Sequence, residues 1–228
     1  MKLVNRMRLA RKRQKAKKDS RMTRQRILAA ATQEFASKGL EGARVDEIAR
    51  RAGANKNMIY HYYGSKDGLF QAVLEEMYGT IRAHQTDTRL SNLSPIDGMR
   101  LLVESMFDVF CKFPAFVSLL QSENLAKARH VRRSSKIAAL YNPFAVTLGG
   151  LLRRGSREGV FRASIDPIDL YVSIASLAAY HISNRYTLSA LFGADIGTPR
   201  AVRRRRGHAV DVILRYIMRE PELAGVIA

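Results

Sequence analysis

Apolar residues recur along this chain at the three- and four-residue spacing of an α-helix, and no segment shows the alternation typical of a strand. Ile27, Ala31 and Phe35 mark one side of a first helix, which Gly39 should end. The same spacing predicts later helices over Pro95–Cys111, Pro114–Ala126, Ile137–Glu158, Pro167–Ala190 and Arg200–Met218. The pattern therefore predicts an all-α protein.

Two short helices joined by a glycine turn are predicted within residues 45–66. The first has one apolar side, formed by Val45, Ile48, Ala49 and Ala52. Gly53 should end it, because glycine adopts a positive φ at little cost. Asn55 is a good N-cap for the second helix, in which Ile59 faces inward. Two short helices with such a turn form a helix-turn-helix.

The outer side of the second short helix carries donors and stacking groups and no acid. Its residues are Lys56, Asn57, Tyr60 and His61. A helix of this kind suits the DNA major groove, where Asn57 and Lys56 are the best candidates for base edges. The candidates for phosphate contacts are Tyr60, Tyr62, Lys66 and Arg44. Lys66 stands at a helix N-terminus, where backbone N–H groups also attract phosphate.

Residues 22–70 resemble the N-terminal domain of the TetR family of bacterial transcriptional repressors. The matching segments are TRQRILAAATQEFASKG (Thr23–Gly39), VDEIARRAG (Val45–Gly53) and NKNMIYHYYGSKDGLF (Asn55–Phe70). Arg44 replaces the usual Ser or Thr cap, so Glu47 has no capping-box partner. Asn57 replaces a small residue, and Gly68 is unusual in the first turn of the fourth helix.

The resemblance implies a DNA-binding transcriptional regulator, predicted to be a repressor that a small effector releases from its double-stranded operator. It implies a helix-turn-helix domain over residues 22–68 and a helical effector-binding and dimerisation domain over residues 69–228. In the family, the last two long helices pair with their copies in a second subunit. Each has an apolar side, formed by Tyr171, Ile174, Ala175, Ala178 and Ile182, and by Val210, Ile213, Leu214 and Ile217. An intrachain core would show the same periodicity, but a homodimer is favoured because one helix-turn-helix reads one half-site.

The charge balance also favours a polyanionic partner. Lys and Arg number 39 against 20 Asp and Glu, and residues 1–24 hold eleven of the bases and one acid. Residues 1–21 are therefore predicted to be a disordered basic arm. Three interpretations stay open: a DNA-contacting arm, a solvated tail, or a true translation start at Met7 or Met22. The run Arg203–Arg206 is interpreted as a solvated helix start rather than a second DNA site.

By the resemblance, the middle helices should enclose an effector pocket rich in Met, Phe and Tyr, which suits a hydrophobic or aromatic effector. Polar groups in apolar surroundings are the candidates for its contacts. These residues are Glu123, Asn124, Tyr141, Tyr180, His181 and Asn184. For each, the alternative is a hydrogen-bonded buried residue or a surface residue.

Other function classes lack sequence support. The chain has no glycine-rich phosphate loop, no Cys/His metal spacing and no G-x-S-x-G motif, so we expect no enzyme, cofactor or metal site. Cys111 is interpreted as a small buried hydrophobe. Without an apolar leader or membrane-length segment, a cytoplasmic protein is expected. The serious alternative is a basic protein that coats DNA without sequence preference, which salt dependence and a specificity ratio would distinguish.

Overall fold

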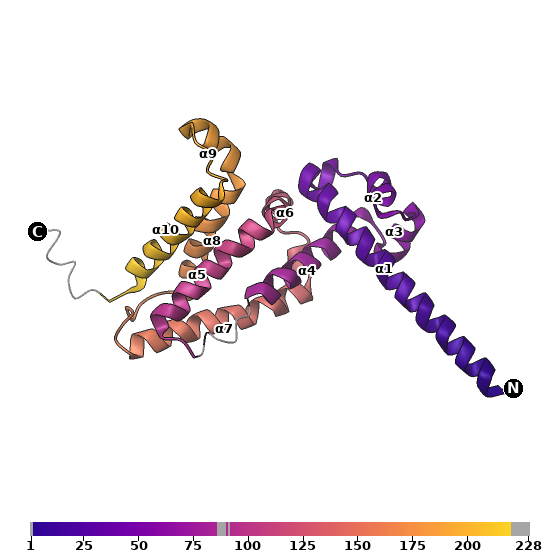
Figure 1. Ribbon diagram of the computed structural model, residues 1–228, viewed down its shortest axis with the longest axis horizontal. Coiled ribbons are helices and arrows are strands. Elements are labelled where there is room, and N and C mark those ends of the chain that lie inside the picture. The colour runs from indigo at the N-terminus through magenta and orange to yellow at the C-terminus, as the bar shows by residue number, and fades with distance from the viewer. Residues whose placement is uncertain (1, 86–89, 91, 220–228) are drawn as a thin grey trace, which may run out of the picture. The chain divides into compact units, whose positions relative to one another are not determined.

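The computed structural model describes residues 2–85, 90 and 92–219, except for the side chains of 2–13, 15–17, 85 and 141–144 (Figure 1). Within this part the chain forms helices, and its extended pairing is one isolated bridge between Phe161 and Met218. The all-α prediction is confirmed. None of the described helices is both long enough and apolar enough to span a membrane.

Ten α-helices and one 3₁₀ turn are described. They are α1 (Lys2–Gly42), α2 (Val45–Ala52), α3 (Lys56–Tyr63), α4 (Lys66–Gln85), α5 (Pro95–Lys112), α6 (Pro114–Leu125), the 3₁₀ turn Val131–Arg133, α7 (Ser135–Arg157), α8 (Pro167–Ser183), α9 (Arg185–Phe192) and α10 (Pro199–Ile217). Three of them share one start signal, a capping side chain followed directly by proline: Ser94 for α5, Asp166 for α8 and Thr198 for α10.

The helices group into two compact units. The first unit comprises Met1–Glu76 and Ser118–Ser134, and the second comprises Met77–Val117 and Ser135–Ala228. Residues 118–134, which the sequence analysis assigned to the C-terminal domain, thus group with the helix-turn-helix. In the first unit α1 packs on α2, and Phe35 meets Phe70 edge to face, with ring centres 5.1 Å apart.

The N-terminal segment differs from the expected disordered arm, because α1 begins at Lys2 (Figure 1). Lys, Arg, Gln and Ala are good helix formers, and residues 2–21 are continuous with the amphipathic part of the helix. The hydroxyl of Thr23 donates to the carbonyl of Asp19, 2.9 Å away, within this continuous helix. Gly39 breaks the regular helical backbone near the end, with φ 68° and ψ 178°, as predicted.

The helix predicted over Pro167–Ala190 is two helices, α8 and α9. Asn184 lies between them with a non-helical ψ of 11°, and its side-chain amide donates to the carbonyl of Tyr180. An asparagine side chain that bonds the backbone of the preceding turn competes with the helical ladder, so the break occurs there.

In the second unit, α5 contacts α7, α8 and α10. Much of the apolar side expected to form the dimer interface is instead buried within the single chain: Ile174, Ala178, Val210, Ile213, Leu214 and Ile217. Core and interface sides have the same helical period, so the sequence pattern could not separate them. The large apolar side chains that α8, α9 and α10 do expose are Ile168, Val172, Tyr180, Tyr186, Leu191, Phe192, Val212 and Tyr216.

Cys111 is a half-buried free thiol on α5. Burial raises its pKa to about 11, with a smaller contribution from the nearby carboxylate of Asp108.

Candidate functional site

The turn between α2 and α3 has the predicted geometry. Gly53 caps α2 in the left-handed conformation, with φ 57° and ψ 42°. Asn55 caps α3, since its side-chain oxygen accepts the backbone N–H of Asn57 at 2.9 Å. Ile59 is fully buried between these elements and the rest of the first unit. The two short helices are therefore fixed at both ends of the turn, as a helix-turn-helix requires.

The start of α2 is held by a buried carboxylate that the sequence analysis missed. Arg44 makes no side-chain cap, and its backbone N–H donates instead to Oε1 of Glu34, 3.3 Å away. Glu34 is fully buried and also bonds the ammonium of Lys38 at 2.8 Å, which lowers the pKa of its carboxyl. Glu34 lies on the apolar side of α1, between Ala31 and Phe35, and this position in the sequence could have indicated a buried carboxylate.

Glu47, left without a capping partner, forms an ion-paired cluster within α2. Its carboxylate accepts from Arg50 at 2.7 and 2.9 Å and from Arg51 at 2.7 Å. These bonds lower the pKa of Glu47 to about 2. The arginines near the turn are thus partly neutralised by an acid of their own helix.

The predicted outer side of α3 is exposed to solvent. Lys56, Asn57, Tyr60 and His61 are all exposed, and none of them is acidic. The ammonium of Lys56 lies 2.8 Å from the carboxylate of Asp46 on α2, and this contact lowers the pKa of Asp46. Lys56 is therefore anchored to α2, whereas the structure shows no hydrogen bond for the Asn57 side chain.

Two of the residues predicted to contact phosphates have partners inside the first unit. The hydroxyl of Tyr62 lies 3.2 Å from that of Ser20, and the guanidinium of Arg24 stands 4.7 Å from the centre of the Tyr62 ring. Lys66 donates to the carbonyl of Glu41 at 2.9 Å. The sequence analysis did not predict the roles of Ser20 and Arg24. They lie one turn apart on α1, on either side of the position where this helix was expected to begin.

The candidate effector residue Glu123 is occupied within the first unit. It is 2% exposed, and its Oε1 accepts the backbone N–H groups of His130 at 2.7 Å and Val131 at 2.9 Å. Its Oε2 lies 2.7 Å from Nδ1 of His130, whose Nε2 is 3.1 Å from Asp67. Asn124 is exposed and donates to the carbonyl of Leu120. Both residues show the structural alternative that the sequence analysis left open.

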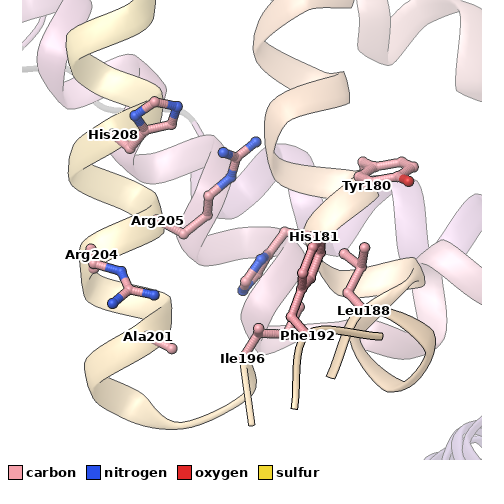
Figure 2. A pocket seen from close by; sticks show the side chains of 9 residues that line it. All are labelled: Tyr180, His181, Leu188, Phe192, Ile196, Ala201, Arg204, Arg205 and His208. Carbon is pink, nitrogen blue, oxygen red and sulfur yellow. The ribbon is translucent and has the colours of Figure 1, made fainter. Parts of the chain in front are cut away.

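In the second unit, Tyr180 and His181 line a cavity of about 440 Å³ (Figure 2). Its walls come from the end of α8, from α9 with the following turn, and from the first turns of α10: Tyr180, His181, Leu188, Phe192, Ile196, Ala201, Arg204, Arg205 and His208. Asn184 does not line this cavity, and its amide donates to the carbonyl of Tyr180 and the hydroxyl of Ser183. The side chain of Tyr141 lies outside the described residues.

His181 is the buried polar group of this cavity. It is 7% exposed, its ring centre lies 6.0 Å from that of Phe107, and its Nε2 has no hydrogen-bond partner among the described residues. Burial is the main cause that lowers its pKa, and the nearby Arg205 acts in the same direction. The nearby backbone of Ile196 acts in the opposite direction and raises the pKa.

Two known protein families match the two parts of this chain. Residues 27–73 match the family described as bacterial regulatory proteins, tetR family, and residues 95–213 match the tetracyclin repressor-like C-terminal domain. The chain belongs to the TetR family. It is accordingly a DNA-binding transcriptional regulator and not an enzyme.

Curated relatives and solved structures agree with this membership. The chain is 34% identical to the HTH-type transcriptional repressor NicS of Pseudomonas putida, over 86% of this chain and 93% of that protein. It is 30% identical to the HTH-type transcriptional repressor SCO4008 of Streptomyces coelicolor, over 80% and 91%. The TetR family transcriptional regulator PfmR of Thermus thermophilus superposes with a TM-score of 0.64 at 27% identity, over 83% and 97%.

Proposed function

We propose that this TetR-family protein is a homodimeric repressor that binds a specific DNA operator through α3 and is released by a small effector. The observation that carries the proposal is the exposed outer side of α3, which presents donors and stacking groups without an acid. Both curated relatives described above are named as repressors, which supports the direction of regulation.

Within the operator complex, we assign Asn57 to a base edge, because its side chain is exposed and can form a bidentate contact. Lys56 contributes from a position fixed by Asp46. We assign His61 to the same groove. The phosphate contacts around it are Tyr60, Tyr62, Arg44 and Lys66. Lys66 stands at the N-terminus of α4, where backbone N–H groups also attract phosphate. The basic N-terminal part of α1 adds positive charge, which attracts the DNA backbone without reading the base sequence.

The dimer is assigned to α8, α9 and α10. These helices expose the apolar side chains Ile168, Val172, Tyr186 and Leu191, and all of them except Val172 are more than 70% exposed. A large exposed apolar set of this kind is typical of a protein interface. A second subunit would also supply the second recognition helix that a two-half-site operator needs.

The second candidate function is sequence-nonspecific DNA coating. It is favoured by one observation, the eleven Lys and Arg in residues 1–24. Binding to DNA from upstream of the protein's own gene, compared with scrambled DNA at two salt concentrations, distinguishes the two. A repressor retains a large preference for the upstream DNA at the higher salt, whereas a coating protein loses both complexes equally.

Asn57→Ala tests the assignment of the reading side chain. The variant should lose about 1–3 kcal/mol of binding free energy for the operator and discriminate less at one base position, while binding to scrambled DNA stays unchanged. Quantitative electrophoretic shifts with single-base operator variants measure both effects. Gln33→Ala, an exposed amide on α1, is the matched control and should bind as the wild type does.

An equal loss on operator and scrambled DNA would instead place Asn57 against the backbone. Unchanged operator binding would remove it from the interface.

A further inference from the structure

The cavity between α8, α9 and α10 has a strongly cationic side. Arg204 and Arg205 both line it, and among the described residues no carboxylate lies within ion-pair distance of either guanidinium. The next residue shows the contrast, because Arg206 pairs with Asp108 at 2.8 Å. Figure 2 shows Arg205 reaching from α10 toward α8. Two guanidinium groups at one cavity without an internal counter-charge favour an anion as the missing partner.

The same cavity holds an unsatisfied buried group. Nε2 of His181 is shielded from solvent and lacks a partner within the described residues, although buried polar atoms are nearly always hydrogen-bonded. The ring is held against Phe107, and it lies on the side of α8 that faces α10 (Figure 2). A ligand that fills the cavity and carries a polar group would give this nitrogen its partner.

Apart from Tyr180 and His208, the rest of the wall is apolar. Leu188 and Phe192 come from α9, Ile196 from the following turn and Ala201 from the start of α10. A cavity of about 440 Å³ lies within the range of small-molecule sites, which combine an apolar lining with a few convergent polar groups. The cationic groups lie on the α10 side, and the apolar groups lie along α9 and the turn. The ligand should therefore be amphiphilic, with charge at one end.

We propose that this cavity binds a small organic carboxylate with an aromatic or compact apolar body. The carboxylate pairs with Arg204 and Arg205, the body packs on Leu188, Phe192 and Ile196, and His181 hydrogen-bonds the polar end. That this carboxylate is the effector rests on the proposed function. The binding site itself rests on the geometry of the cavity.

Isothermal titration of the full-length protein with 2-naphthoate, and with the neutral 2-naphthamide of the same shape, tests the site. We expect 2-naphthoate to bind and 2-naphthamide to bind at least about tenfold more weakly, since a hydrogen bond to a charged group is worth about that factor or more. Arg205→Gln should weaken 2-naphthoate by about tenfold or more and leave 2-naphthamide unchanged.

The chain offers a matched control beside the site. Arg203→Gln removes the same charge from the same run, but Arg203 is exposed and does not line the cavity, so 2-naphthoate should bind it as it binds the wild type. Arg204→Gln is a second test should Arg205→Gln fail to fold, and circular dichroism checks each variant. Equal weakening by Arg203→Gln and Arg205→Gln would reduce the effect to general charge and overturn the site.

Two further outcomes separate this inference from the proposed function. If 2-naphthoate fails to bind while operator binding is intact, the carboxylate site is overturned and the repressor proposal stands. If 2-naphthoate binds as expected but no operator preference is found, the repressor proposal fails and the site stands. A third outcome would assign the cavity to the partner subunit. In that case Arg205→Gln changes the dissociation of the dimer in sedimentation experiments but leaves 2-naphthoate binding unchanged.

Discussion

Each of the two units buries one histidine, and the surroundings of the two rings are opposite. In the first unit both ring nitrogens of His130 lie within hydrogen-bond distance of carboxylate oxygens, those of Glu123 and Asp67. In the second unit Nε2 of His181 has no partner among the described residues, and the neighbouring Arg204 and Arg205 have no counter-charge there. A buried polar cluster that is complete within the chain stabilises the fold, whereas an incomplete one favours a ligand.

The complete cluster also shapes the backbone. Lys127 and Ala128 both have a positive φ, of 56° and 58°, which is uncommon for residues other than glycine. The chain can fold back there because the carboxylate of Glu123 accepts two backbone N–H groups beyond the turn, and its carbonyl accepts the N–H of Ala128. Glu123 is therefore bound to the turn at several points.

The largest expected effect comes from breaking the complete cluster. Glu123→Ala leaves two backbone N–H groups and the buried His130 ring without their acceptor, and it should lower the free energy of unfolding by about 3–5 kcal/mol. Urea denaturation followed by circular dichroism measures this. Glu76→Ala removes an exposed carboxylate from α4 and should change stability by no more than about 0.5 kcal/mol. Similar losses in the two variants would contradict a special role for Glu123.

A smaller effect is expected at the exposed end of the same cluster. The hydrogen bond from His130, with the nearby Arg129 adding to it, lowers the pKa of Asp67 below its usual 3.8. A lowered carboxyl pKa stabilises the fold above the unfolded value, and this stabilisation is lost as the pH falls through the folded pKa. Asp67→Asn should cost about 0.5–1 kcal/mol at neutral pH, because the Asp67 side chain is 55% exposed.

The pH dependence sharpens that test. The stability difference between Asp67→Asn and the wild type should shrink as the pH falls below 3.8, when the wild-type carboxyl also becomes protonated. Urea midpoints at neutral and acidic pH measure it, with Glu76→Gln on the same helix as the control. A difference that stays constant across this range would mean that the charge of Asp67 contributes nothing.

The smallest effect on ligand binding is predicted beside the incomplete cluster. The Asn184 amide is already used within the chain by Tyr180 O and Ser183, so Asn184→Ala should leave 2-naphthoate affinity within about twofold of the wild type. It should cost about 1 kcal/mol of stability through the lost hydrogen bonds. Titration calorimetry and thermal unfolding measure the two quantities. A strong loss of ligand binding would extend the site to Asn184.

Local patterns predicted much of the fold. The two short helices, the Gly53 and Asn55 caps and the exposed side of α3 follow from neighbouring residues, and the structure has them. The sequence could not predict which apolar side of α8 is buried within the chain and which is exposed, because helical periodicity is identical for a core and an interface. The break at Asn184 depends on a side chain that bonds its own backbone, which apolar spacing does not register.

The candidate sites divide for a similar reason. Glu123 and His181 are both polar residues within apolar runs, so the sequence analysis treated them alike. The residues that separate them are distant in sequence. Asp67 lies 63 residues from His130 and completes one cluster. Arg205, on another helix, lies near His181 but carries a like charge and gives it no hydrogen-bond acceptor. Whether a buried polar group is satisfied is a property of tertiary contacts, and no local motif reports it.

The raised pKa of Cys111 makes this protein convenient for spectroscopic labelling. With a pKa of about 11, on the order of one thiol in ten thousand is ionised at neutral pH, and the thiolate is the form that reacts with maleimides and methanethiosulfonates. The chain contains no other cysteine. A cysteine introduced on the exposed side of α1 would therefore carry a spin label or fluorophore almost alone. Distances between the two copies in a dimer become measurable without removing the native residue.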